Sequence, residues 1–190
     1  MLIGIGHRSG HGKDTLADFM VQQIKAKFPK HKVLKYPFAW KIKLIAYDLY
    51  KQFGVREPEY YDTLEGRADR NIVLPKLGMT VVELWIKIGT PCFRDIIYDG
   101  TWTAFVRTLA NEPDTIIVAP DARFPNEVGD IDYLIKCVNP RVPDRQGLSV
   151  DENLKDFDGW DTVVVNDAGL LQLAAKSQQV VDKIPFFKWI

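Results

Sequence analysis

Short apolar runs along the chain predict five β-strands. Each run is bounded by turn-forming residues, as is typical of strands that are buried on both faces of a sheet. The runs are residues 1–6, 32–36, 114–121, 132–138 and 161–165.

Longer segments between these runs carry apolar residues at helical spacing. In the first segment Leu16, Met20 and Ile24 recur every four residues and would lie on one side of a helix. The expected helices are residues 15–28, 39–53, 80–89, 101–110 and 170–184. Gly89 is expected to end the third helix, and residues 54–62 are expected to form a polar loop. Strands that alternate with helices predict an α/β fold with a five-stranded parallel sheet and right-handed crossovers.

Ligands of such sheets bind at the carboxyl ends of the strands, and a glycine-bearing segment, GHRSGHGKDT (residues 6–15), follows the first strand. A loop of the form G-x-x-x-x-G-K-[ST] curls its backbone N–H groups around phosphate oxygens, and its lysine adds a positive charge. Gly12 and Lys13 fit this pattern, whereas His7 and Asp14 depart from it. The helix that follows would direct unpaired N–H groups at the loop, so we expect a phosphate site. A glycine turn that binds nothing is the alternative.

Composition narrows the classes of partner. The chain has 190 residues, and its 25 basic and 25 acidic side chains give a formal net charge of zero. This length predicts one domain, and the charge balance argues against a nucleic-acid partner. Cys92 and Cys137 fit no metal-ligand spacing, so we interpret them as reduced thiols of a cytoplasmic protein. Neither a membrane-spanning run nor a signal peptide is expected.

Two charged residues follow the third strand. The carboxylate of Asp121 can orient a substrate hydroxyl or reach the shell of a magnesium ion, and Arg123 can grip a phosphate with its planar fork. In the alternative, Asp121 caps a helix and Arg123 pairs with Glu127 on the helix surface. Spacing does not choose between the two.

Three more arginines are candidates. Arg94 lies in a mostly apolar helical stretch, and taken alone it is interpreted as a surface residue. Arg141 and Arg145 lie between the fourth and fifth strands, in a segment punctuated by proline and glycine that is either a mobile lid or a solvated basic loop. Phosphoryl transfer needs positioned cations, a metal and closure against water. A phosphate loop together with these arginines favours that chemistry.

In their order along the chain, five segments resemble phage-type deoxynucleoside monophosphate kinases. GHRSGHGKDT is similar to the family's phosphate loop, which usually ends in GKDT, and PFAWKIK resembles FA-x-P-L-K, with Lys41 in place of proline. KIGTPCFRDIIYDGTW is similar to the GT-x-x-x-R stretch, with Arg94 as its arginine. PDARFPNE resembles D-x-R-F-x-N-E, and DTVVVNDAGLLQL resembles the closing N-x-G-x-x-x-x-L. The segment QGLSVDEN lacks the histidine of the family's lid but keeps its serine and glutamate, Ser149 and Glu152.

The resemblance implies a P-loop NTPase fold of the nucleoside monophosphate kinase type, as a single domain over residues 1–190. Within it, a helical acceptor-binding region would span about 38–110 and a lid about 139–153. The implied activity transfers the γ-phosphoryl group of ATP to a deoxynucleoside monophosphate and yields the diphosphate and ADP. The implied partners are ATP and the monophosphate, and homodimerisation stays open.

The resemblance also implies roles for individual residues. The implied ATP-binding residues are Ser9, Gly10, His11, Gly12, Lys13, Asp14, Thr15 and Asn166. The implied catalytic residues are Lys13, Arg94, Asp121, Arg123, Arg141 and Arg145. The implied acceptor-binding residues are Phe38, Trp40, Lys43, Arg94, Asp121, Arg123 and Glu127. Asn166 would flank the adenine, and Mg²⁺ would be held by Asp14 or Thr15, directly or through water.

Two rival functions stay open. One is a P-loop kinase for another small phosphate or alcohol, similar to phosphomevalonate or dephospho-coenzyme A kinases. The aromatic residues Phe38, Trp40, Trp85 and Trp102 favour a base-stacking acceptor pocket over this rival, unless all four belong to the core. The other rival is a nucleotide-binding module without transfer activity.

Overall fold

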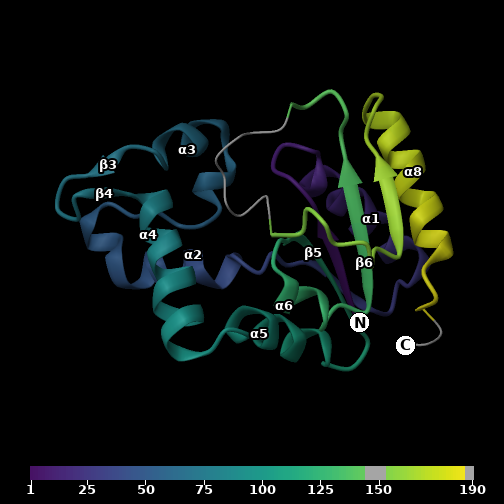
Figure 1. Cartoon of the computed structure of the whole chain (residues 1–190), viewed down its shortest axis with the longest axis horizontal. Coiled ribbons are helices and arrows are strands. Elements are labelled where there is room, and N and C mark those ends of the chain that lie inside the picture. Colours follow the sequence, from purple (N-terminus) through teal and green to yellow (C-terminus); the bar gives the residue numbers. More distant parts are fainter. Residues whose placement is uncertain (144–152, 187–190) are drawn as a thin grey trace. The chain divides into compact units, whose positions relative to one another are not determined.

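The computed structural model describes residues 1–143 and 153–186 and contains a five-stranded sheet flanked by helices (Figure 1). The strands are β1 (Leu2–Gly6), β2 (Lys32–Lys35), β5 (Thr115–Ala122), β6 (Tyr133–Val138) and β7 (Thr162–Val165). Their order is β2-β5-β1-β6-β7, and every neighbouring pair is parallel. The predicted α/β class and the five predicted strands are therefore confirmed.

Two helices cover one face of this sheet. α1 (Lys13–Lys27) and α8 (Leu170–Lys183) share a core cluster with the central strand, in which Ile5, Leu16 and Val181 are fully buried. The spacing of apolar residues on α1 explains the contact, because Leu16, Met20 and Ile24 lie on one side of the helix. Burial of each such side chain contributes about 1.5–3 kcal/mol. This core fixes the position of the residues at the start of α1.

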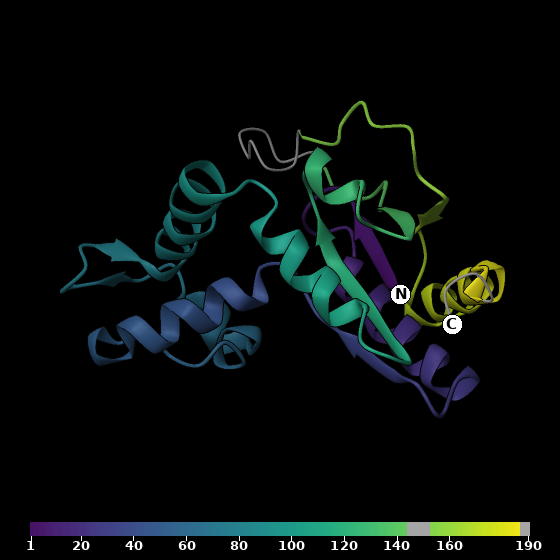
Figure 2. The same cartoon turned by 90° about the horizontal axis from the view of Figure 1, so that it is seen from below.

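Two further helices lie directly before and after β5 in the sequence. α5 (Thr101–Ala110) precedes the strand, and the ring of its Phe105 lies 6.1 Å from the ring of Tyr36, just after β2. α6 (Pro125–Val128) is a single short turn that follows β5. Figure 2 shows α5 running along the strand that follows it.

The chain forms two compact units, where the sequence predicted one domain with a helical region at about 38–110. The first unit comprises residues 1–37 and 103–190 and contains the sheet, and the second comprises residues 38–102. The second unit contains α2 (Trp40–Tyr50), η1 (Lys51–Phe53), η2 (Tyr60–Asp62), α3 (Leu64–Asp69), a hairpin of β3 (Val73–Leu74) and β4 (Met79–Thr80), α4 (Val81–Lys87) and η3 (Ile88–Ile97). It has its own core, in which Ala46, Val81 and Leu84 are buried.

The prediction that Gly89 ends a helix is wrong. α4 continues at Ile88 into η3, a π-helix that runs through Gly89 and contains Pro91. A Cβ atom at Gly89 would overlap Ile42, so close packing against α2 explains the glycine better than a helix end does. The expected polar loop at 54–62 also contains a helical turn, η2.

No helix in the described part of the chain combines the length and the apolar character needed to cross a bilayer.

Candidate functional site

The glycine loop, defined here as residues 6–13, joins the central strand β1 to the first turn of α1. Its backbone is left-handed at three positions: His7 with φ 93°, Gly10 with φ 81° and Gly12 with φ 93°. Glycine adopts such angles without strain, which explains two of the three residues. His7 carries the strain of a non-glycine residue at positive φ, a feature that often marks functional sites.

Lys13 is held against the beginning of this loop. The side chain is only 6% exposed, and its Nζ donates hydrogen bonds to the carbonyl oxygens of His7 (2.8 Å) and Arg8 (2.6 Å). An ammonium group is thus fixed beside the first residues of the loop, next to the N-terminus of a helix. Both features favour an anion at this position.

The loop is anchored from behind by the ends of β6 and β7. The carbonyl oxygen of His11 accepts from Nδ2 of Asn166 (3.1 Å) and from Sγ of Cys137 (3.3 Å). The ring of His11 is 3% exposed, and its Nδ1 accepts the backbone N–H of Asn139 at 3.0 Å. These contacts fix the loop to strands that are far away in sequence. Asn166 therefore contacts the glycine loop itself.

An open pocket of about 520 Å³ lies beside the loop, and none of the described residues that line it is acidic. Its lining residues are His7, Arg8, His11, Lys136, Val138, Asn139, Pro140, Val142 and Pro143. After β1 the chain continues to β2 at one edge of the sheet, and after β6 it continues to β7 at the other edge. The two connections therefore run in opposite directions. Ligands of open α/β sheets bind at such a switch point, at the carboxyl ends of the strands. The pocket occupies this position and carries positive charge.

The surroundings of His7 keep its imidazole neutral. Burial first, and then the positive charges of Lys136, His11, Arg8 and Lys13, lower the pKa of His7 to about 4. Nδ1 of His7 is buried and has no hydrogen-bond partner among the described residues. Protonation of this ring would add a cation to a site that is already cationic.

This pKa predicts a pH dependence of stability. The pKa of His7 is the ordinary 6.5 in the unfolded chain and about 4 in the folded chain, so between these pH values the unfolded chain binds the proton more readily. The stability that depends on the neutral ring is therefore complete above about pH 6.5 and is lost as the pH falls toward about 4. We expect the free energy of unfolding to fall more steeply over this range in the wild type than in His7→Asn, as measured by urea unfolding at a series of pH values. Asparagine tolerates positive φ and does not titrate. Equal slopes in the two proteins would contradict the assignment.

The carboxyl end of β5 lies next to the start of the loop. Asp121 is the penultimate residue of β5, inside the strand predicted at 114–121 and not past its end. Ala122 pairs with Gly6 across a local irregularity in register between β1 and β5. Parallel strands lie about 4.8 Å apart, so the backbone at Asp121 is close to the beginning of the glycine loop.

Glu127 and Arg123 form the turn after β5. Glu127 is 4% exposed, and its Oε2 accepts the backbone N–H groups of Arg123 (2.7 Å) and Phe124 (3.0 Å). The alternative that placed Glu127 on a helix surface is therefore wrong. The carboxylate closes the first turn of α6 and fixes the backbone from which Arg123 projects, because two charge-assisted hydrogen bonds hold it.

The two candidate metal ligands lie in the first turn of α1. Asp14 has a side chain 78% exposed, and its Oδ1 is 3.9 Å from Nζ of Lys35. Among the described residues, no three His, Cys, Asp or Glu side chains come together as a metal cage. Mg²⁺ that arrives with nucleotide phosphates needs only one or two protein oxygens and keeps several waters. An exposed carboxylate and the adjoining hydroxyl of Thr15 fit that requirement.

The predicted acceptor residues of the second unit are held in two clusters. Arg94 is 8% exposed, which corrects its interpretation as a surface residue, and its Nη2 lies 3.5 Å from Oδ1 of Asp99. Nζ of Lys43 lies 3.3 Å from Oδ1 of Asp62 and faces the rings of Trp40 and Trp85 at 5.8 and 5.2 Å.

The four candidate aromatic residues differ in burial. Phe38 and Trp102 are buried, and Nε1 of Trp102 donates to the carbonyl oxygen of Gly89 at 2.9 Å, so Trp102 is part of the core. Trp40 and Trp85 are half-buried. Nε1 of Trp85 is a buried donor without an acceptor in the described part of the unit.

The predicted lid is described only at its edges. Arg141 is exposed, and its backbone N–H donates to Oδ1 of Asn139 at 3.0 Å. Arg145, with Ser149 and Glu152, lies outside the described residues.

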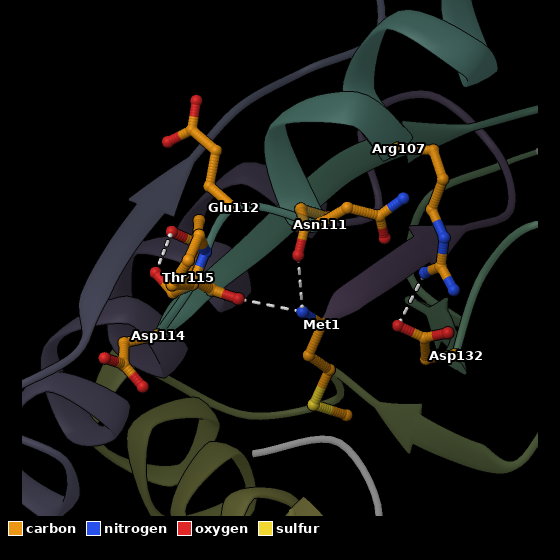
Figure 3. Close-up of a pocket in the computed structure, with 9 residues that line it drawn as sticks. Met1, Arg107, Asn111, Glu112, Asp114, Thr115 and Asp132 are labelled. Carbon is orange, nitrogen blue, oxygen red and sulfur yellow. Dashed lines mark hydrogen bonds and ion pairs between the residues drawn. The ribbon is translucent and has the colours of Figure 1, made fainter.

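A second pocket, of about 350 Å³, opens at the amino edge of the sheet (Figure 3). The amino group of Met1 donates to the carbonyl oxygens of Ala110 (2.9 Å) and Thr115 (2.8 Å), and Arg107 pairs with Asp132 at 2.6 Å. None of the predicted site residues lines this pocket. The contacts of its lining residues join the start of β1 to the start of β5, so we assign this region a structural role.

Two side chains near the glycine loop, Lys136 and Trp160, were not among the predicted site residues. Nζ of Lys136 lies 5.8 Å from the ring of Trp160, which packs so closely over Gly6 that a Cβ atom there would overlap it. A single lysine inside the apolar run at 132–138 was the available signal for Lys136. Trp160 precedes β7 and had no such signal.

A scan against protein-family models and a search of curated proteins found no match for this chain.

Proposed function

We propose that this protein is a P-loop kinase that transfers the γ-phosphoryl group of ATP to a deoxynucleoside monophosphate. The observation that carries the proposal is the glycine loop. It combines two left-handed glycines, a buried lysine over the loop and the N-terminus of α1, all at the switch point of a parallel sheet. Backbone N–H groups, a fixed ammonium group and a helix dipole are what polyphosphate binding requires.

The donor half of the reaction follows from the loop. Backbone N–H groups from Ser9 to Lys13 hold the β- and γ-phosphates, and Nζ of Lys13 leaves the carbonyl oxygens of His7 and Arg8 to bind the same phosphates. Asn166, whose side chain contacts the loop at His11, flanks the adenine. Asp14 or Thr15 would hold Mg²⁺ together with the phosphates, and the metal would supply positive charge against the charge that develops on the transferred group.

The acceptor half of the reaction depends on cationic side chains. Arg94 and Arg123 bind the phosphate of the monophosphate and Lys43 assists them. Asp121 orients a hydroxyl group of the acceptor, and the aromatic side chains support its base. An oxygen of the acceptor phosphate forms a bond to the γ-phosphorus, the bond from that phosphorus to the β–γ bridging oxygen breaks, and ADP leaves with both electrons of that bond. The enzyme contributes by positioning and by charge, since this transfer needs little covalent chemistry from the protein.

A test with different acceptors separates this function from its rivals. We expect ADP to form from ATP and Mg²⁺ in proportion to added dAMP, dGMP, dCMP or dTMP, with an equal amount of the matching diphosphate. Chelation should abolish the reaction and Mg²⁺ should restore it. Dephospho-coenzyme A, phosphomevalonate and a sample without acceptor serve as controls.

Two outcomes would contradict the proposal. ADP formation at the same slow rate with and without every acceptor would indicate a nucleotide-binding module. Turnover with phosphomevalonate or dephospho-coenzyme A, but with none of the four monophosphates, would indicate the other class of kinase.

A further inference from the structure

We propose that Lys136 binds the terminal phosphate of the donor nucleotide and makes the site selective for a triphosphate over a diphosphate. The proposal rests on the proposed function for the identity of the donor. It adds a residue from β6, outside the glycine loop, to the residues that hold the transferred group.

The position of Lys136 is set by strand register. β6 pairs with β1 in parallel, and Lys136 pairs with Gly6, the last residue of β1. Ile135 and Cys137 belong to the core beneath α1 and α8, so Lys136 projects from the opposite face of the sheet. There it lines the open pocket together with His7, Arg8 and His11. A strand residue thus places a cation beside the first residues of the loop.

Lys136 faces the first residues of the glycine loop, and the terminal phosphate is expected to bind beside these same residues. Nζ of Lys13 lies on the carbonyl oxygens of His7 and Arg8, and the lysine of a phosphate loop reaches the β- and γ-phosphates. His7 and Arg8 also line the pocket with Lys136. The ammonium groups of Lys13 and Lys136 therefore approach the same end of a bound polyphosphate.

The charge of Lys136 is poorly balanced within the described protein. Two other lysines of the sheet have carboxylate partners: Lys32 pairs with Glu112 at 2.8 Å and Lys35 with Asp18 at 2.7 Å. In residues 1–143 and 153–186, no ion pair joins Lys136 to a carboxylate, and its Nζ instead lies over the ring of Trp160. The positive field of Lys136 reaches His7, whose pKa it helps to lower. A half-buried cation among other cations is stabilised when a polyanion enters.

Affinities for nucleotides that differ only in phosphate number test this assignment. We expect Lys136→Met, which keeps the aliphatic stem against Trp160, to weaken binding of a non-hydrolysable ATP analogue by about tenfold or more, the scale of one lost charge-assisted contact. Binding of ADP should change by less than about threefold, on the same reasoning, because the lost contact is to the third phosphate. Lys136→Arg should restore most of the selectivity, since it keeps the charge.

The measurement is isothermal titration calorimetry at one fixed salt concentration with Mg²⁺. Lys32→Met is the matched control, because Lys32 is a lysine of the same sheet at its amino edge. Thermal unfolding of each variant by circular dichroism checks that it is folded. If Lys136→Met does not fold, the comparison of Lys136→Arg with Lys136→Gln decides between charge and packing.

Failure of this inference is distinguishable from failure of the proposed function. A wild-type protein that binds ATP and phosphorylates a monophosphate, with Lys136→Met unchanged in both affinities, would overturn only the role of Lys136. Equal weakening for the ATP analogue and for ADP would move the contact to an inner phosphate and would also overturn it. A wild-type protein that binds none of the nucleotides would overturn the proposed function, and this inference with it.

Discussion

Replacing Lys13 by alanine is expected to lower the rate of phosphoryl transfer by about a hundredfold or more, the scale seen when one preorganised charge-stabilising group is removed. The lysine is buried over the glycine loop and donates to two loop carbonyl oxygens. In the proposed reaction it moves to the β- and γ-phosphates, where charge develops in the transition state. Initial rates of ADP formation at saturating acceptor measure the effect.

Lys25→Ala is the control for this change, because Lys25 is an exposed lysine on the same helix. Lys13→Ala also leaves the carbonyl oxygens of His7 and Arg8 without their donor, at a cost of about 1–3 kcal/mol in stability. Urea unfolding of both variants therefore accompanies the kinetics. A folded Lys13→Ala protein with a near-normal rate of phosphoryl transfer would contradict the role of the glycine loop in the reaction.

Replacing Gly12 by alanine is expected to abolish nucleotide binding and to lower the free energy of unfolding by about 2–5 kcal/mol. The left-handed backbone at Gly12, with φ 93°, costs a residue with a Cβ atom about 1–2 kcal/mol. The added Cβ would also overlap Nδ2 of Asn166, and such overpacking adds about 1–3 kcal/mol. Calorimetry with ATP and urea unfolding measure the two effects.

Three variants separate the causes. Gly10→Ala has the backbone strain, with φ 81°, but its Cβ would meet only Val142 at an ordinary 3.6 Å, so we expect a smaller loss of stability. Asn166→Ala in the Gly12→Ala background removes the overlap and should recover part of the stability. Gly129→Ala, where a Cβ atom meets nothing within 4 Å, should be neutral. Unchanged ATP binding in Gly12→Ala would show that the loop shape is not needed.

Local sequence patterns predicted most of the fold. The apolar runs that became β1, β2, β5, β6 and β7 are recognisable because a strand buried on both faces needs nearly every residue to be apolar. The glycine loop was also predictable from a short stretch of sequence, because the backbone at Gly12 is left-handed immediately before α1 and glycine adopts that conformation without strain. Gly89 shows the limit of such reasoning. A glycine at a predicted helix end and a glycine under a neighbouring helix look the same in sequence.

The surroundings of the loop were decided only by tertiary structure. The sequence by itself determined that Lys13 follows a glycine loop, that Asp121 and Arg123 come near the end of a strand, and that Asn166 follows another strand. The pairing of Lys136 with Gly6, the packing of Trp160 over Gly6 and the burial of Arg94 and Glu127 depend on which strands and helices become neighbours. Strand order and register are set by core packing summed over many distant residues, so no short stretch of sequence encodes them.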